Sequence, residues 1–253
     1  MLKILLSGCN GTMGQVIKNF IAEHREIKII AGFDQDPKRH NNNFPVYSDI
    51  HLCQEDADVI IDFSHFSAFE NITNYAKQRK LPLVMATTGL NEENENQLRQ
   101  LSKEIPVFRT ANMSLGVNVI MDLIRRASKT LADTFDIEII EKHHNKKVDA
   151  PSGTALMLAQ CIDQALEGET NFIYGRHTKQ DHRDKKDIGI HAVRGGTIVG
   201  EHSILYAGID ELIEIKHTAF SKNVFAGGAI KAAKYIASKE NGYYTMEDIL
   251  AKN

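Results

Sequence analysis

The chain begins with the run Met1-Leu2-Lys3-Ile4-Leu5-Leu6-Ser7-Gly8-Cys9-Asn10-Gly11-Thr12-Met13-Gly14, in which an apolar segment leads into three glycines. The apolar segment predicts a buried strand over residues 2–6. After the glycines, apolar residues recur at helical spacing at Val16, Ile17, Phe20 and Ile21. A strand, a glycine turn and a helix in this order are typical of the first unit of a doubly wound parallel sheet.

The glycine turn favours a dinucleotide site, although its spacing is G-x-x-G-x-x-G and the usual form is G-x-G-x-x-G. A second strand is predicted over residues 27–33 and ends at Asp34, about twenty residues after the turn, where a carboxylate can bind the adenosine ribose. Lys38 and Arg39 follow shortly, so a 2′-phosphate remains possible. Asp34-Gln35-Asp36-Pro37 would also form an ordinary turn.

Strands and helices continue to alternate up to residue 114. Further strands are predicted over residues 58–64, 83–86 and 106–110, with helices over about 67–79 and 91–103, while residues 38–57 are polar and predicted to be irregular. Ligands of such sheets bind at the carboxyl ends of the strands. Phe63-Ser64 and Ala86-Thr87-Thr88 are therefore candidate cofactor walls, although Thr87-Thr88-Gly89 would also suit a turn that caps the next helix.

The second half of the chain has a different pattern. A helix is predicted over residues 115–131, followed by strands over 135–140, 188–193, 197–206 and 211–216, with hairpins at Arg194-Gly195-Gly196 and Ala207-Gly208-Ile209-Asp210. A helix over 224–237 is expected to return to the first region. The fold class is therefore α/β: an N-terminal doubly wound parallel sheet, plus a C-terminal α+β domain with a mostly antiparallel open sheet. We expect one domain from residues 1–114 with 221–253, and a second from 115–220.

One loop concentrates the reactive side chains, and it reads Glu141-Lys142-His143-His144-Asn145-Lys146-Lys147-Val148-Asp149-Ala150-Pro151-Ser152-Gly153-Thr154-Ala155. A histidine here can transfer a proton near neutral pH, and Lys147 adds a cation. Ser152 is a good N-cap, and the backbone N–H groups of Gly153 and Thr154 can bind a carboxylate at the start of the helix. The pattern predicts an active site for a small acidic substrate. An ordinary capped helix after a basic surface loop would have the same pattern.

The composition argues against several other classes of protein. The 253 residues carry a net charge of −3 with dispersed Lys and Arg, so neither nucleic acid nor a membrane surface is an expected partner. We expect no signal peptide and no membrane span, because the apolar runs are too short. Three separated cysteines fit a reducing cytoplasm. No metal is expected, since the histidines lack ligand spacing.

The glycine turn at residues 8–14 and the run at 141–155 together resemble the dihydrodipicolinate reductases, also called 4-hydroxy-tetrahydrodipicolinate reductases, of bacterial lysine and diaminopimelate biosynthesis. The resemblance covers essentially the whole chain, including residues 194–202 and 225–229. It implies a cytoplasmic enzyme that reduces 4-hydroxy-tetrahydrodipicolinate to tetrahydrodipicolinate with NADH or NADPH. It also implies a homotetramer formed through the C-terminal sheets, with the cofactor on the N-terminal domain and a cyclic dicarboxylate substrate on the C-terminal one.

The resemblance also implies roles for single residues. His143 is the expected general acid/base, Lys147 a proton donor, and His144 a substrate contact. Gly153 and Thr154 are expected to hold a substrate carboxylate. The expected cofactor contacts are Gly8, Cys9, Asn10, Gly11, Thr12, Met13, Asp34, Ala86, Thr87, Thr88, Thr110, Ala111, Asn112 and Met113.

The sequence departs from the family pattern at positions that affect the cofactor. Many members carry a cation where this chain has Thr12 and Gln35, and those cations meet the 2′-phosphate of NADPH. Without them Asp34 faces the ribose, which predicts a tilt toward NADH, with dual use still possible through Lys38 or Arg39. The family's usual glycine is replaced by Ala86, a small change that should not abolish binding.

Two alternatives remain open from the sequence. The chain could be another two-domain nicotinamide-dependent dehydrogenase of a small acid, or an NAD(H)-binding sensor without catalysis. The presence of both His143 and Lys147 argues against the sensor, and a turnover assay separates the two.

Overall fold

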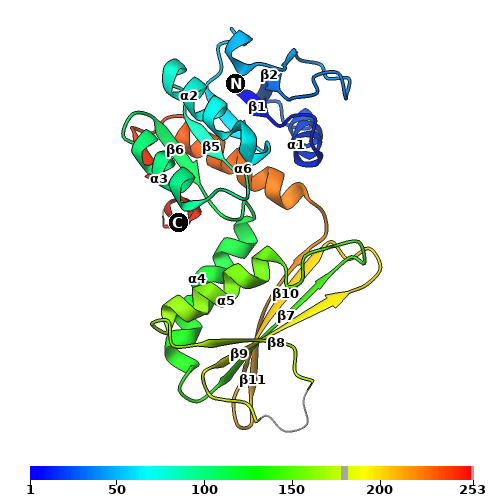
Figure 1. Cartoon of the computed structure of the whole chain (residues 1–253), viewed down its shortest axis with the longest axis vertical. Helices are drawn as coiled ribbons and strands as arrows, with labels where there is room; N and C mark the ends of the chain where they lie inside the picture. Colours follow the sequence, from blue (N-terminus) through cyan, green and yellow to red (C-terminus); the bar gives the residue numbers. More distant parts are fainter. Residues whose placement is uncertain (178–181, 252–253) are drawn as a thin grey trace. The chain divides into compact units, whose positions relative to one another are not determined.

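The computed structural model describes residues 1–177 and 182–251, and the chain forms two compact units. The first unit contains Met1–Leu115 and Lys222–Asn253, and the second contains Gly116–Ser221 (Figure 1). The last two residues of the expected segment 221–253 lie outside the described residues.

The first unit is built on a parallel sheet of seven strands. Its order is β12-β6-β5-β4-β1-β2-β3, and every neighbouring pair is parallel. The strands are β1 (Leu2–Ser7), β2 (Ile27–Phe33), β3 (Val46–Tyr47), β4 (Val59–Asp62), β5 (Leu83–Met85), β6 (Pro106–Arg109) and β12 (Gly242–Tyr244). The expected doubly wound, Rossmann-like sheet is confirmed.

Helices cover both faces of this sheet, because its strands are apolar on both sides. Ile4 and Leu6 of β1 join one buried cluster with α1 (Thr12–Ala22), α6 (Asn223–Ile236) and α7 (Met246–Leu250). Leu5 points the other way and joins a second cluster with α2 (Phe69–Arg79) and α3 (Glu92–Leu101). A strand that is buried on both faces reads as a continuous apolar run, as residues 4–6 do.

The second unit is a five-stranded mixed sheet with helices on one face. Its order is β11-β10-β7-β9-β8. The strands are β7 (Asp136–His143), β8 (Asn171–Tyr174), β9 (Asp187–Arg194), β10 (Gly200–Ala207) and β11 (Leu212–Ala219). The pairs β7–β10 and β10–β11 are antiparallel, whereas β9 is parallel to β7 and β8. The expected C-terminal sheet, mostly antiparallel, is confirmed in this mixed form.

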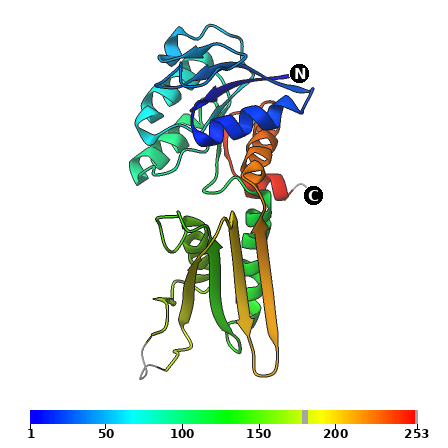
Figure 2. The same cartoon turned by 90° about the vertical axis from the view of Figure 1, so that its right-hand side faces the viewer.

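Two helices, α4 (Leu115–Leu131) and α5 (Gly153–Ala165), pack on the sheet of the second unit (Figure 2). Residues along β7 alternate between partly exposed and buried, with Ile137 and Ile139 under the helices. The other face of the sheet has no helix among the described residues. This alternation is the pattern of a strand with one covered and one open face.

Three expectations about local structure were wrong. No hairpin joins β9 to β10 at Arg194-Gly195-Gly196, because β7 lies between them and pairs with both; the hairpin at residues 207–210 does form between β10 and β11. The strand expected over residues 135–140 continues to His143, since β9 and β10 pair along it. The region 38–57, expected to be irregular, contains β3 and a short 3₁₀ helix at Ile50–Leu52. In addition, the structure contains two strands that were not predicted, β8 and β12.

Among the described residues, no helix has both the length and the apolar character needed to cross a membrane.

Candidate active site

The glycine turn connects β1 to α1 and leaves the start of α1 open. Gly8 has a φ of +73°, and a Cβ on it would lie 2.6 Å from the carbonyl oxygen of Phe63. A Cβ on Gly14 would lie 2.2 Å from the carbonyl oxygen of Gly8. The N-cap residue, Gly11, makes no side-chain hydrogen bond to the helix. The backbone N–H groups at the start of α1 therefore have no side-chain cap and suit a bound phosphate.

Asp34 lies beside this turn and is held by backbone groups. Its carboxylate oxygens accept hydrogen bonds from the N–H of Asn10 at 2.9 Å and the N–H of Asp36 at 3.0 Å. A cavity of about 310 Å³ opens here. Its lining residues are Gly8, Gly11, Phe33, Asp34, Gln35, Phe63, Ser64, His65 and Ala68. The cavity thus combines the glycine turn, the acidic residue and the Phe63-Ser64 wall, as a ribose site requires.

Several expected cofactor residues are buried, so only their backbone can meet a ligand. Cys9 and Asn10 are almost fully buried, and burial together with the nearby Asp34 raises the pKa of the Cys9 thiol to about 12. The side-chain amide of Asn10 donates to the carbonyl of Asp36 and accepts from Asn42 at 2.8 Å. These contacts fix the segment after β2 against the glycine turn. Asn42 was not expected to have this role.

The loop after β5 is fixed by three hydrogen bonds of Thr87. The hydroxyl of Thr87 donates to the buried carboxylate of Asp62 at 2.6 Å and also lies 2.9 Å from the carbonyl of Ser64. Arg109 donates to the carbonyl of Thr87 at 2.9 Å while its guanidinium pairs with Glu95 at 2.7 Å. Thr88 remains exposed next to them. Ala86, Thr87 and Thr88 therefore present a rigid edge at the carboxyl end of the sheet.

The loop after β6 rests on α6. Thr110 accepts from the N–H of Asn112, whose side chain accepts from the N–H of Ser114 at 2.8 Å. The carbonyl of Met113 lies so close to Gly228 of α6 that a Cβ on Gly228 would be 1.6 Å from it. Thr110, Ala111, Asn112 and Met113 thus also lie at the carboxyl ends of the parallel strands, within the same unit as the glycine turn.

In the second unit, His143 is the last residue of β7, and the expectation that it lies in the loop after the strand was wrong. Its register partner on β9 is Arg194. The ring Nδ1 lies 2.6 Å from Oε2 of Glu141, two residues earlier on the same face of the strand. His143 is largely buried and Glu141 is fully buried.

The Glu141 carboxylate is the centre of a network of hydrogen bonds. Arg194 donates from Nη1 to Oε2 and from Nη2 to Oε1, both at 2.7 Å, and the N–H of Ser152 donates to Oε1 at 2.9 Å. Burial alone would raise the pKa of Glu141, but the hydrogen bonds from Arg194, His143 and Ser152 outweigh it and lower the pKa. The carboxylate therefore stays ionised, with charge-assisted partners on both oxygens.

Ser152 begins α5 and connects it to a second histidine. Its hydroxyl accepts from the N–H of Ala155 at 3.1 Å, which confirms the expected N-cap, and it lies 2.9 Å from Nε2 of His202. The His202 and His143 rings pack edge to face, with centroids 5.2 Å apart. Burial and the nearby His143 lower the pKa of His202 to about 4, so this ring is neutral near pH 7.

The rest of the loop is more exposed. Nζ of Lys147 lies 2.7 Å from Oδ1 of Asp149. His144 and Thr154 are partly exposed and Gly153 is exposed, with no atom within 4 Å of where a Cβ on Gly153 would lie. The start of α5 is therefore accessible to a ligand, beside the buried pair of Glu141 and His143.

The structure thus brings together His143, Lys147, Gly153 and Thr154 near the start of α5, and the fourteen expected cofactor residues at the strand ends of the first unit. No role was predicted from the sequence for Glu141, Arg194 or His202. The alternation along residues 135–143 could have shown that Glu141 and His143 share the buried face, but nothing local points to Arg194.

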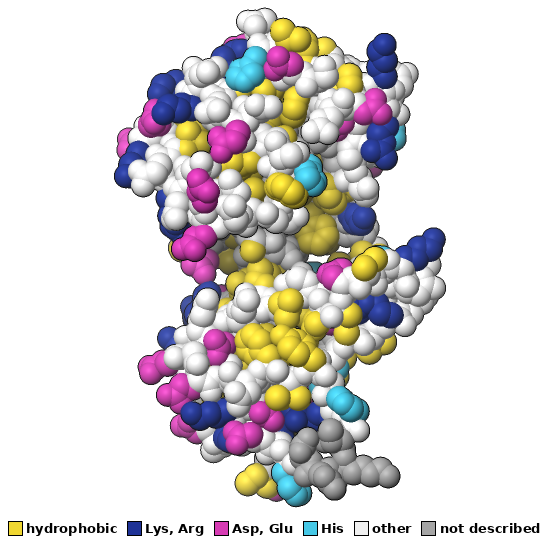
Figure 3. All heavy atoms as spheres, in the orientation of Figure 1, with side chains coloured by type: hydrophobic (Ala, Val, Ile, Leu, Met, Phe, Trp, Pro, Cys, Tyr) yellow, Lys and Arg dark blue, Asp and Glu magenta, His cyan; other side chains and the backbone are white. Residues whose placement is uncertain are grey.

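Figure 3 shows no large patch of a single charge on the face that it draws. Positive and negative side chains are interspersed there over both units. Within the described residues, no three His, Cys, Asp or Glu side chains are grouped to hold a metal ion.

Comparison with known proteins gives a consistent result over the whole chain. Residues 2–113 match the family model for dihydrodipicolinate reductase, N-terminus, and residues 116–250 match the one for its C-terminus. A 4-hydroxy-tetrahydrodipicolinate reductase of Caldanaerobacter subterraneus is 51% identical over 252 residues, covering 100% of this chain and 99% of the relative. That of Clostridium tetani is 48% identical, covering 99% and 97%.

A solved structure shows the same fold. The dipicolinate-bound dihydrodipicolinate reductase of Paenisporosarcina superposes with a TM-score of 0.80 at 23% identity, covering 98% of this chain and 99% of the other.

Proposed function

The chain belongs to the dihydrodipicolinate reductase family and is an oxidoreductase of the 4-hydroxy-tetrahydrodipicolinate reductase type, and we propose that it reduces 4-hydroxy-tetrahydrodipicolinate to tetrahydrodipicolinate with NADH or NADPH. The reaction belongs to the diaminopimelate route of lysine biosynthesis. We assign the cofactor to the first unit, and the substrate, a cyclic dicarboxylate, to the second.

The first unit fits a nicotinamide dinucleotide. The open start of α1 suits the pyrophosphate, and the cavity beside Asp34 suits the adenosine ribose. Cys9, Asn10 and Met13 would contribute through the backbone near the turn, and the loops at 86–88 and 110–113 would line the nicotinamide. When bound, the cofactor supplies a hydride. With Thr12 and Gln35 at positions where the family often has cations, the ribose pocket favours NADH, and Lys38 or Arg39 leaves NADPH use open.

The second unit fits the acidic substrate. The N–H groups of Gly153 and Thr154 would hold one carboxylate at the start of α5, where the helix dipole favours negative charge. Lys147 adds a positive charge and a proton donor, and His144 contacts the substrate from the loop. No other residue type at position 153 would leave the backbone as accessible.

His143 would deliver the proton. In the overall reaction the substrate takes up a hydride and a proton, and its 4-hydroxyl leaves as water. As the ring accepts the hydride, negative charge develops on it, and a histidine is a suitable donor of the proton. The partly exposed edge of the imidazole is the part that can face the substrate, because the opposite nitrogen is bonded to Glu141. Lys147 would stabilise the developing charge beside it.

The open face of the five-stranded sheet supports a homotetramer. It has no helix over it among the described residues, and exposed apolar side chains at Val193 and Leu212 alternate with ion pairs such as Lys216–Glu201. The edge strand β11 is long and largely exposed. Such a face is typically covered by a second copy of the chain. We place this assembly in the cytoplasm.

One observation carries the proposal: the Glu141 carboxylate joins His143 and the N–H of Ser152, so a proton donor lies beside an open helix start. The test is a coupled assay in which the preceding synthase makes the substrate from pyruvate and aspartate semialdehyde, with NADH and NADPH oxidation followed in parallel. Turnover supports the proposal. No turnover in a protein that still binds NADH would overturn it.

A further inference from the structure

Two glutamates of β7 lie on opposite faces of the same strand, and each contacts a histidine. Glu141 lies on the helix-covered face and Glu138 on the open one. Glu141 Oε2 is 2.6 Å from His143 Nδ1, and Glu138 Oε2 is 2.7 Å from His191 Nε2. β7 therefore carries two similar carboxylate–histidine contacts: the one between Glu141 and His143 is buried, and the one between Glu138 and His191 is half-buried.

The Glu141 carboxylate has all of its acceptor positions filled. Oε1 accepts from Arg194 Nη2 and the N–H of Ser152, and Oε2 accepts from Arg194 Nη1 and His143 Nδ1. A carboxylate has about four acceptor positions, so no further group can bind without displacing one of these. Four donors from three parts of the chain thus fix the carboxylate in one orientation.

This arrangement determines which nitrogen of His143 carries a proton. An ionised carboxylate can only accept hydrogen bonds, so the contact at 2.6 Å requires a hydrogen on Nδ1. In the neutral ring Nε2 is then the basic atom, and in the charged ring Nε2–H is the hydrogen free to transfer. Arg194 and Ser152 favour the ionised form of Glu141, and they keep the proton on the histidine side.

The same carboxylate sets the position of the ring relative to α5. Because it bonds both Nδ1 of His143 and the N–H of Ser152, it connects the proton donor directly to the start of the helix. The ring lies over Gly200, where a Cβ would be 3.1 Å from Nε2. Because Gly200 has no Cβ, it places no side chain against Nε2, and the bond at Nδ1 keeps the ring from turning.

We propose that Glu141 is a positioning residue for the reduction: it holds His143 in the form with hydrogen on Nδ1, so that Nε2 exchanges the proton with the substrate. The proposal rests on the proposed function, in which His143 is the proton donor. Glu141 does not touch the substrate in this role and acts through His143 alone.

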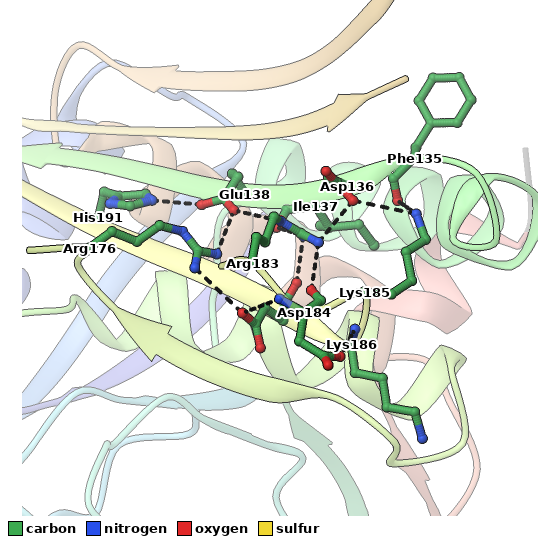
Figure 4. Close-up of polar contacts among 11 residues, drawn as sticks. Phe135, Asp136, Ile137, Glu138, Arg176, Arg183, Asp184, Lys185, Lys186 and His191 are labelled. Carbon is green, nitrogen blue, oxygen red and sulfur yellow. Dashed lines mark hydrogen bonds and ion pairs between the residues drawn. The ribbon is translucent and has the colours of Figure 1, made fainter. Parts of the chain in front are cut away.

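Glu138 provides the matched control (Figure 4). Its Oε1 accepts from Arg176 at 2.9 Å and from Arg183 at 3.2 Å, and its Oε2 contacts His191. The same side chain crosses over Gly189, where a Cβ would collide with the carboxylate. Glu138 thus has arginine and histidine partners like those of Glu141, but on the face without α5. A general loss of strand stability would follow from either substitution, whereas a loss of proton transfer would follow only from Glu141→Gln.

The experiment compares Glu141→Gln with Glu138→Gln in the coupled assay. For Glu141→Gln we expect kcat to fall about 100-fold while the substrate KM changes much less, since a positioned acid or base contributes a factor of this order. For Glu138→Gln we expect kcat close to that of the wild type. Thermal melting and sedimentation of both variants report folding and assembly. A kcat for Glu141→Gln equal to that of the wild type would overturn the proposal.

A second measurement is made on the wild-type protein and does not depend on either glutamate variant folding. In protein labelled with ¹⁵N-histidine, the ring signals of His143, assigned with His143→Ala, should show hydrogen on Nδ1 in the neutral form. Hydrogen on Nε2 would overturn the proposal even if the enzyme is active. Absence of wild-type turnover with either cofactor would instead count against the proposed function, and the ring signals would still test the position of the proton.

Discussion

Nζ of Lys147 lies 2.7 Å from Oδ1 of Asp149, so this lysine is already paired with a carboxylate two residues later in the same loop. The hydrogen bond from Lys147 lowers the pKa of Asp149, and the backbone N–H of Gly153 contributes to the same effect. We assign both groups to the substrate: the N–H of Gly153 to a carboxylate, and Lys147 to the developing negative charge. Asp149 therefore competes with the substrate for the same donors.

Substituting Asp149→Asn should lower the substrate KM about threefold with little change in kcat, because the competing charge is removed. The side chain of Asp149 is 58% exposed, so the loss of stability should stay below about 1 kcal/mol. Steady-state kinetics with varied substrate measure this. Glu169→Gln is the control, since it removes a surface pair of similar length, with Lys186 at 2.8 Å. A rise in KM would show instead that Asp149 orients Lys147 in the complex.

Substituting His143→Ala should lower kcat by a factor of about 100 to 10,000 while the affinity for NADH stays near that of the wild type. The reason is that His143 belongs to the second unit, whereas the expected cofactor residues belong to the first. Turnover and NADH binding by fluorescence measure the two effects separately. His191→Ala, on the open face of the sheet, is the control. Equal losses of turnover and NADH affinity would contradict the assignment.

The sequence predicted the parallel sheet well because its signals are local. β1, β4, β5 and β6 are each an apolar run followed by a turn and a helical pattern, and β2 is an apolar run that leads into the two-residue β3. The short β12 has no such pattern and depends on pairing with β6, far away in the sequence. The wrong hairpin at residues 194–196 has the same cause: the local turn residues are correct for a hairpin, but β7 pairs between the two strands.

The candidate site shows the same limit. The histidines, Lys147 and the helix cap lie within one short motif, so the sequence showed them directly. Arg194 reaches Glu141 only because β7 and β9 pair with His143 opposite Arg194, and no spacing within the loop encodes that register. His202 reaches Ser152 through the pairing of β10 with β7 for the same reason.

The wild-type KM for NADH should be lower than that for NADPH. Asp34 lines the cavity that we assign to the adenosine ribose, and Gln35 beside it offers no positive charge to a 2′-phosphate. Substituting Gln35→Arg should lower the KM for NADPH about tenfold and change that for NADH little, because a charged hydrogen bond contributes this much. Gln54→Arg adds the same charge at an exposed position that is not among the residues lining the cavity. A wild-type KM markedly lower for NADPH would contradict the prediction.

Stability should fall between pH 7 and pH 5 because of His202. Burial and the neighbouring His143 lower the pKa of His202 to about 4. His217 and Lys147 add smaller lowering contributions, and all of these together outweigh the raising effect of Glu141 on this pKa. In the unfolded chain a histidine titrates near pH 6.5, so below that pH the unfolded chain binds a proton that the folded chain excludes. The free energy of unfolding should decrease by about 2 kcal/mol over this interval through His202 alone.

Urea unfolding at pH 7 and pH 5 measures this decrease, and His202→Gln should reduce it. Exposed His40→Gln is the control and should leave it unchanged. Carboxylates with lowered pKa values, such as Glu138 and Glu141, lose their contribution only as the pH falls further. If His202→Gln has the same difference between the two pH values as the wild type, the buried histidine is not the cause.

The adjacent glycines of α6 should respond oppositely to alanine. A Cβ on Gly228 would lie 1.6 Å from the carbonyl oxygen of Met113, whereas a Cβ on Gly227 would make an ordinary contact of 3.7 Å with Phe20. Gly228→Ala should therefore lower the free energy of unfolding by about 2 kcal/mol through overpacking. Gly227→Ala should raise it by about 0.5 kcal/mol, because alanine favours the helix.

The same pair tests the cofactor loop. Since Met113 belongs to the segment that we assign to the nicotinamide, Gly228→Ala should also weaken NADH binding, while Gly227→Ala should not. Urea unfolding and NADH titration of both variants give the two quantities. If Gly228→Ala loses stability but binds NADH as the wild type does, residues 110–113 do not contact the cofactor. If the two alanines behave alike, the close approach of Met113 to α6 does not limit packing there.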